Sequence, residues 1–102
     1  MKEIFKTNYI NIVFDEKYKV VFTIWLDSIF TSEQYRDVWE RTLDFGNKND
    51  VNYFLSDIIN QKVVLPNDRK WFEDDVIPRA IKTGIKKGAI ILGWVLKISF
   101  FC

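Results

Sequence analysis

The stretch at 31–57, TSEQYRDVWERTLDFGNKNDVNYFLSD, decides the fold because a helix is followed directly by a strand. Thr31 with Gln34 three residues later has the pattern of a capping box, which predicts the start of a helix. Apolar side chains then recur at helical spacing, which predicts an amphipathic helix that ends near Gly46. Residues 51–57 form a compact apolar run followed by polar residues, as expected of a buried strand.

Alternating apolar residues precede this helix. Residues 9–15 and 18–26 have the period of two that is typical of strands, and together they predict a hairpin. Residues 2–6 predict a short edge strand. Because a helix connects 18–26 to 51–57, we expect a right-handed crossover that makes these two strands parallel. Their carboxyl ends should then lie at the same edge of the sheet.

A second helix and another strand follow. Asn67 or Asp68 is placed to cap the helix, and Pro78 predicts a kink or a junction of two short helices near Val76–Ile77. Residues 88–96 predict a further strand. The fold class is therefore α/β: a mixed β-sheet with an N-terminal β-hairpin and βαβαβ units, with the helices packed on the sheet, in a single domain over 1–102.

Composition excludes several classes of function. A formal charge of +1 over 102 residues provides no basic stripe for nucleic acid. The single cysteine, Cys102, permits no internal disulfide, which suits a cytoplasmic protein. The apolar tract 88–102 contains Lys97 and is shorter than the roughly 20 residues of a membrane-spanning helix, so we expect a soluble protein with no transmembrane segment.

The chain has few groups suited to catalysis. It contains no histidine, which is the commonest general base, and it has no glycine-rich phosphate loop, so we expect no cofactor. Asp27 and Asp57 remain. Brought together at one sheet edge, they would form an acid–base pair or hold a magnesium ion. The interpretation that we favour is that each aspartate ends a strand and accepts hydrogen bonds from turn amides.

Residues 53–91 resemble the bacterial STAS/SEC14-type proteins, also called SpoIIAA-like. The matching features are a strand that ends in Asp, a loop with Pro before an acidic residue, a Trp in the next helix, a PRA step and a Gly. The residues are Asp57, Pro66, Asp68, Trp71, Pro78, Arg79, Ala80 and Gly84. The resemblance extends more loosely over 9–92. It implies a STAS-like fold and a non-catalytic regulatory or interaction module.

The chain departs from that family in two ways. The anti-sigma-factor antagonists of the wider group carry a phosphorylatable serine after this strand, whereas 58–68 contains no Ser, Thr or Tyr, so we expect no phosphoswitch. Family members also continue with a helix, a strand and a helix after the strand that matches 88–95. We therefore expect either a C-terminally truncated reading frame or a chain that is completed by a partner, most simply a second copy.

A ligand site is expected at the carboxyl edge of the sheet, because open α/β sheets bind ligands outside the carboxyl ends of parallel strands. The loop 58–67 should lie there, with KVVL at 62–65 as an apolar wall. The candidate ligand-binding residues are Asp27, Asp57, Asn60, Gln61 and Arg69. The first hypothesis is a STAS-like module that acts through protein contacts or a small ligand, apolar by analogy with the SEC14-like relatives. The alternative is a carboxylate-dependent, magnesium-assisted enzyme that uses Asp27 and Asp57.

Four aromatic residues are candidates for an interface with a second copy or with a regulatory protein. Trp25 lies on the row of its strand opposite the main apolar row, and the others lie near the C-terminus. The candidate interface residues are Trp25, Trp94, Phe100 and Phe101.

Overall fold

The structure, a computed structural model, describes residues 1–83, 87–91 and 98–101. The elements in chain order are β1 (Lys2–Lys6), β2 (Ile10–Asp15), β3 (Val20–Trp25), α1 (Ser32–Lys48), β4 (Tyr53–Asp57), α2 (Pro66–Trp71), the π-helical turn η1 (Phe72–Val76), α3 (Ile77–Lys82), β5 (Lys87–Ile91) and β6 (Ile98–Phe101). The α/β class is confirmed, whereas its STAS-like character stays a prediction. No helix in the described part of the chain is long and apolar enough to cross a bilayer.

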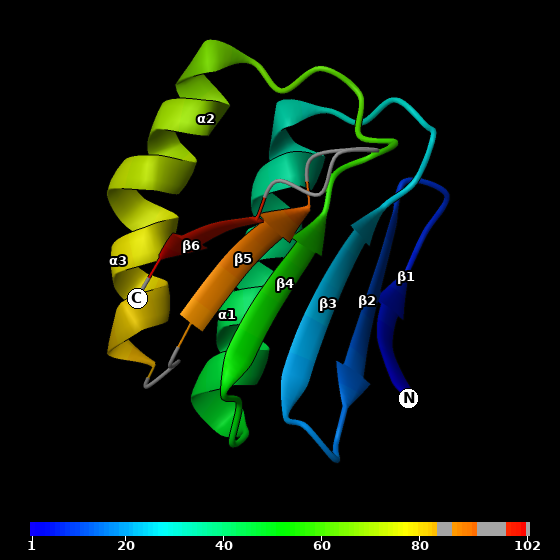
Figure 1. Ribbon diagram of the computed structural model, residues 1–102. Coiled ribbons are helices and arrows are strands. Elements are labelled where there is room, and N and C mark those ends of the chain that lie inside the picture. Colours follow the sequence, from blue (N-terminus) through cyan, green and yellow to red (C-terminus); the bar gives the residue numbers. More distant parts are fainter. Residues whose placement is uncertain (84–86, 92–97, 102) are drawn as a thin grey trace.

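The strands form a mixed sheet in the order β1-β2-β3-β4-β5-β6. Strands β1 to β3 are antiparallel neighbours, β3, β4 and β5 are parallel, and β6 is antiparallel to β5. The predicted hairpin and parallel crossover are therefore confirmed. Strands β3 and β4 end at the same edge of the sheet, beside the start of α1 and the loop that leads to α2 (Figure 1).

The helices pack on one face of this sheet (Figure 1). Between the two layers lies the core, in which Ile10, Ile12, Val21 and Val38 have no accessible surface. No described helix covers the opposite face. Burial of the apolar rows of β2, β3 and β4 against the helices provides a driving force for folding.

Helix α1 begins with the predicted capping box: the Thr31 hydroxyl accepts a hydrogen bond from the Gln34 amide, and the Gln34 side chain accepts one from the Thr31 amide. The predicted end at Gly46 is wrong, because the helix continues to Lys48. Gly46 instead lies against β4, where a Cβ would come within 3.0 Å of the Phe54 ring. This glycine permits close packing of helix on strand.

The second helical region begins earlier than predicted and changes its geometry midway. Helix α2 begins at Pro66 without a side-chain cap, so the predicted cap at Asn67 or Asp68 is wrong. The expected junction at Val76–Ile77 is confirmed, and it takes the form of the π turn η1. Pro78 has no amide hydrogen for the normal helical ladder, and the turn before it uses i→i−5 bonding instead.

The prediction that Trp25 is an interface residue is wrong. Its side chain is 1% exposed and packs against Tyr35, with the ring centroids 5.4 Å apart. The cause is the pairing of β3 with β2, which aligns Trp25 with Ile10 and Val21 with Phe14. The fully apolar row of β2 belongs to the core, and this pairing brings the Trp25 row to the same side.

The other interface candidates fall outside what the structure describes. Trp94 lies outside the described residues. Phe100 and Phe101 belong to β6, whose backbone pairs with β5, but their side chains are not among those described.

Candidate functional site

Two loops lie side by side at the carboxyl edge of β3 and β4 (Figure 1). The loop after β3 carries Asp27, and the loop after β4 carries Lys62. An ion pair joins them, with the Lys62 Nζ 2.5 Å from the Asp27 Oδ1. Both side chains are largely exposed, so the pair contributes little to stability.

The two aspartates proposed as a catalytic pair each have another partner. Asp57 accepts a hydrogen bond from the Ile59 amide at 3.1 Å, which is the turn chemistry favoured from the sequence. Asp27 is engaged by Lys62. Among the described residues, no group of three acidic, Cys or His side chains is placed to hold a metal ion. A carboxylate mechanism stays a prediction, and these contacts give it no support.

A cavity of about 430 Å³ lies below the loop that follows β4, between α1 and η1. We call it the carboxyl-edge pocket. Its walls are mostly aromatic and aliphatic side chains from both helices and from the loop, with a few polar groups among them. The lining residues are Tyr35, Trp39, Ser56, Ile58, Gln61, Val64, Arg69, Phe72, Glu73 and Ile77.

The carboxyl-edge pocket has a neighbour of about 370 Å³ that lies along α2, which we call the outer depression. Val64, Arg69 and Glu73 line both, so the two spaces share a wall. The outer depression adds the exposed Val63 and a second cation, Lys70. A ligand that filled both spaces would have its inner part among aromatic rings and its outer part beside two cations, Arg69 and Lys70, and the carboxylate of Glu73.

The π turn builds one wall of the carboxyl-edge pocket. The Ile77 amide donates a hydrogen bond to the Phe72 carbonyl, five residues earlier. The two residues are therefore separated by one π-helical turn, and both line the pocket. Turns of this kind recur at functional sites because they change which side chains share a face of a helix. Here the turn adds Glu73 to that wall.

Two hydroxyl groups contribute to the inner part of the pocket. Ser56 is 5% exposed, and its Oγ accepts a hydrogen bond from the Thr23 hydroxyl at 2.9 Å. Burial raises the pKa of the Tyr35 phenol to about 12. The phenol is therefore neutral at physiological pH and remains a hydrogen-bond donor.

A buried carboxylate fixes the spacing between α1 and α2. Asp68 is 3% exposed and accepts hydrogen bonds from the Ser32 hydroxyl at 2.6 Å and from the Arg36 Nε at 2.9 Å. The Arg36 guanidinium also lies over the Trp71 ring. Burial opposes the charge on Asp68, but the hydrogen bonds from Ser32 and Arg36 prevail and lower the pKa of that carboxyl below its ordinary value.

Replacing Asp68 by asparagine is expected to lower the free energy of unfolding at pH 7 by about 1.5–3 kcal/mol, the usual range for hydrogen bonds to a charged group. Because the folded-state pKa is the lower one, the contribution of the charge is present above the ordinary carboxyl pKa of 3.8 and is lost as pH falls through the folded-state pKa. Urea unfolding should show that the free energies of unfolding of wild type and Asp68→Asn differ less near pH 3 than at pH 7. Asp44→Asn, which removes one partner of an exposed ion pair, is the control. If wild type and Asp68→Asn differ by the same amount at both pH values, the assignment is wrong.

The structure brings together part of the predicted ligand site. Gln61 and Arg69 line the carboxyl-edge pocket, whereas Asp27, Asp57 and Asn60 are not among its lining residues. Among residues 1–83, no carboxylate lies within ion-pair distance of Arg69.

Sequence reasoning missed the aromatic lining of the pocket. Trp39 lies on the apolar stripe of α1, a position typical of a core residue, and it is 5% exposed. The same side chain also lines the pocket, together with Tyr35 and Phe72. Helical spacing carries no signal that separates these two roles.

Comparison with known proteins gives no further assignment: no protein-family model, no curated protein and no solved structure matches this chain. Its function is therefore inferred from the carboxyl-edge pocket.

Proposed function

We propose that the protein is a non-catalytic regulatory module of STAS-like type that binds a small, mostly apolar ligand with one anionic group. The observation that carries this proposal is the carboxyl-edge pocket, in which aromatic and aliphatic walls surround a few polar groups. Its volume of about 430 Å³ falls within the range of small-molecule sites, and its composition is typical of them.

The charges indicate how a ligand would be oriented. Arg69 lies where the carboxyl-edge pocket meets the outer depression, and Lys70 lies farther out along α2. The planar guanidinium of arginine suits a carboxylate, which it binds through two parallel hydrogen bonds. The apolar body of the ligand would fill the inner space against Trp39 and Phe72, with its anionic group beside Arg69.

Regulation would act through the loop above the pocket. This loop presents exposed aliphatic side chains, with Val63 84% exposed and Leu65 57% exposed. Val64, between them, lines the pocket. A partner that bound these exposed side chains would contact the same segment as the ligand, and this would couple ligand binding to partner binding.

A thermal-shift screen tests the proposal. The compounds are monocarboxylates with aliphatic or aromatic bodies, the matched primary amides, and nucleotides as an unrelated anionic class. Carboxylates that fit should raise Tm, because a ligand at 100 times its Kd stabilises the folded state by about 2.7 kcal/mol. Matched amides should raise it less. If no carboxylate raises Tm, or if nucleotides raise it more, the proposed ligand class is wrong.

A further inference from the structure

The face of the sheet opposite the helices is apolar along its centre. Val13, Phe22 and Leu55 form a row across β2, β3 and β4, because Val13 pairs with Phe22 and Phe22 with Leu55. Val20 and Ile24 flank Phe22 along β3. All five side chains remain partly exposed. We call these five residues the open-face patch.

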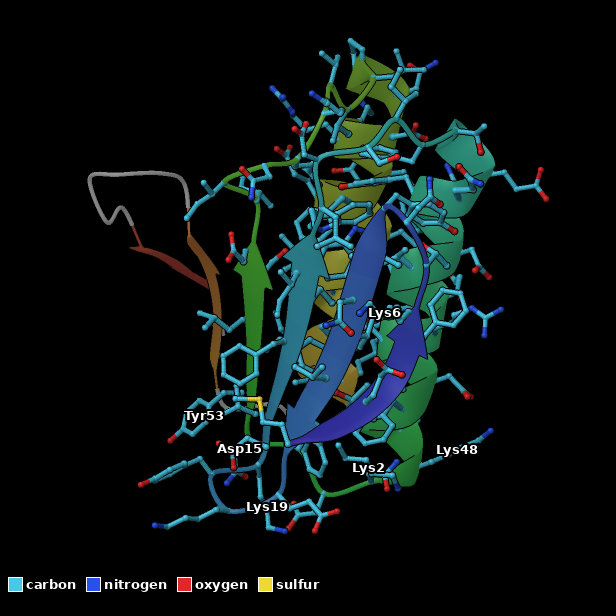
Figure 2. All side chains as sticks on the ribbon, turned by 90° about the vertical axis from the view of Figure 1, so that its right-hand side faces the viewer. Lys2, Lys6, Asp15, Lys19, Lys48 and Tyr53 are labelled. Carbon is cyan, nitrogen blue, oxygen red and sulfur yellow. The ribbon has the colours of Figure 1, made fainter. Side chains whose placement is uncertain are left out.

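Charged and polar groups lie at the β1 side and at one end of this patch. Figure 2 views the sheet from the edge strand β1, and it shows Asp15, Lys19 and Tyr53 at the lower end of the sheet and Lys6 at the end of β1. An apolar centre inside a polar rim is the usual anatomy of a protein interface. Apolar patches on soluble proteins commonly mark such contacts.

One row across this face contains a cation on β1 and an anion on β4. The register aligns Lys6 with Asn11, Asn11 with Ile24, and Ile24 with Asp57. Lys6 is therefore on the edge strand β1 and Asp57 is on β4, where the row continues to Ile91 of β5. A partner that carried one strong sign of charge would be repelled by one of these two side chains. A surface that carried the same two charges in the reverse order would be attracted by both.

We propose that the open-face patch binds a second copy of this chain, in a symmetric dimer whose two-fold axis runs parallel to the strands between β2 and β3. This rotation places Lys6 opposite the partner's Asp57 and Asp57 opposite the partner's Lys6. It also brings the Phe22 region against the partner's Val13, so that the two apolar centres meet. Aligned packing of two sheets is a common arrangement in proteins.

The size of the face sets the expected affinity. Strands β1 to β4, at about 4.8 Å spacing and five residues of about 3.3 Å rise, give roughly 300 Å² of flat sheet per copy. Two copies give roughly 600 Å² of flat sheet; side-chain relief increases the accessible area, but the interface stays below the usual range of specific complexes, which bury about 1,200–2,000 Å² in total. The dimer should therefore have a Kd in the micromolar range and be visible only at sufficient concentration.

Sedimentation equilibrium from about 5 to about 500 µM tests the dimer, since weak interfaces form in this range. The mass should rise with concentration toward twice the 12.2 kDa of the chain. Phe22→Glu should hold the mass at that of one chain throughout. Ile29→Glu, a matched charge on the exposed loop between β3 and α1, should leave the rise unchanged. Wild type that stays monomeric, or a dimer that Phe22→Glu leaves intact, would overturn the proposal.

A charge exchange tests the axis without depending on the folding of the Phe22 variant. Lys6→Asp opposes two carboxylates in each half of the interface, and Asp57→Lys opposes two ammonium groups, so each variant alone should dimerise at least about 10-fold more weakly. An equimolar mixture restores both attractive pairs and should recover the wild-type mass profile. If the mixture is as monomeric as its components, the proposed pairing is wrong.

Discussion

Replacement of Trp25 by alanine is expected to lower the free energy of unfolding by about 3–5 kcal/mol, the usual cost of removing a buried tryptophan. The side chain is 1% exposed and lies against Phe30 and Tyr35, with ring centroids 4.9 and 5.4 Å away. The loss leaves a cavity that these rings fill only in part. For a domain whose total stability is about 5–15 kcal/mol, this is a large fraction.

The result separates a core role from an interface role. Urea unfolding, monitored by circular dichroism, measures the change, and Val63→Ala at an 84% exposed site is the control, expected within about 0.5 kcal/mol of wild type. If Trp25→Ala unfolds at the wild-type urea concentration, then Trp25 is not part of the core, and the interface role predicted from the sequence would be restored.

Replacement of Arg69 by glutamine is expected to weaken binding of an apolar monocarboxylate about 10- to 100-fold, because a charge-assisted bidentate pair is lost. Affinity for the matched amide should change little, since that ligand carries no anionic group. The guanidinium has no ion-pair partner among residues 1–83, so its removal leaves no unpaired carboxylate and should not reduce stability.

Isothermal titration of both ligands into wild type, Arg69→Gln and Lys82→Gln provides the measurement. Lys82 is an exposed residue in the last turn of α3 and lines neither the carboxyl-edge pocket nor the outer depression, so it controls for net charge. An equal loss of affinity in both variants would mean that long-range charge, and not contact with Arg69, attracts the ligand.

Much of the fold could be predicted from local patterns. The capping box of Thr31 and Gln34 marks the start of α1, and the helix between two strands predicts the parallel pairing of β3 with β4. The orientation of β3 could not be obtained in this way. Both of its rows are apolar, one with Phe22 and the other with Trp25, so the strand alone does not indicate which row faces the helices. Pairing with β2, whose rows differ in polarity, decides it.

The candidate site was predictable only in outline. The rule that ligands bind at the carboxyl ends of parallel strands led to the loop after β4, and Gln61 and Arg69 do line the pocket found there. The aromatic walls depend on the distance between α1 and η1, which is fixed by long-range contacts such as that of Asp68 with Arg36. Contacts between residues more than 30 positions apart leave no periodic signal in the sequence.

The open-face patch and the carboxyl-edge pocket occupy different parts of the sheet. The pocket lies on the helix side, where Tyr35 and Trp39 of α1 face it, and the patch lies on the opposite side. A second copy bound at Phe22 would therefore leave the pocket open. Ligand binding and dimer formation can be measured separately, because Arg69→Gln and Phe22→Glu each alter one surface.

The central claim is that the carboxyl-edge pocket binds a small apolar carboxylate, and titration followed by ¹⁵N-edited nuclear magnetic resonance tests it most directly. The indole signals of Trp39, which lines the pocket, and of Trp25, which is not a lining residue and is linked to the pocket through its stacking on Tyr35, report on the two positions in one spectrum. Binding in the pocket predicts that the Trp39 signal shifts more than the Trp25 signal and saturates at one ligand per chain. If no carboxylate shifts the Trp39 signal, or if the Trp25 signal shifts as much, the pocket is not the ligand site.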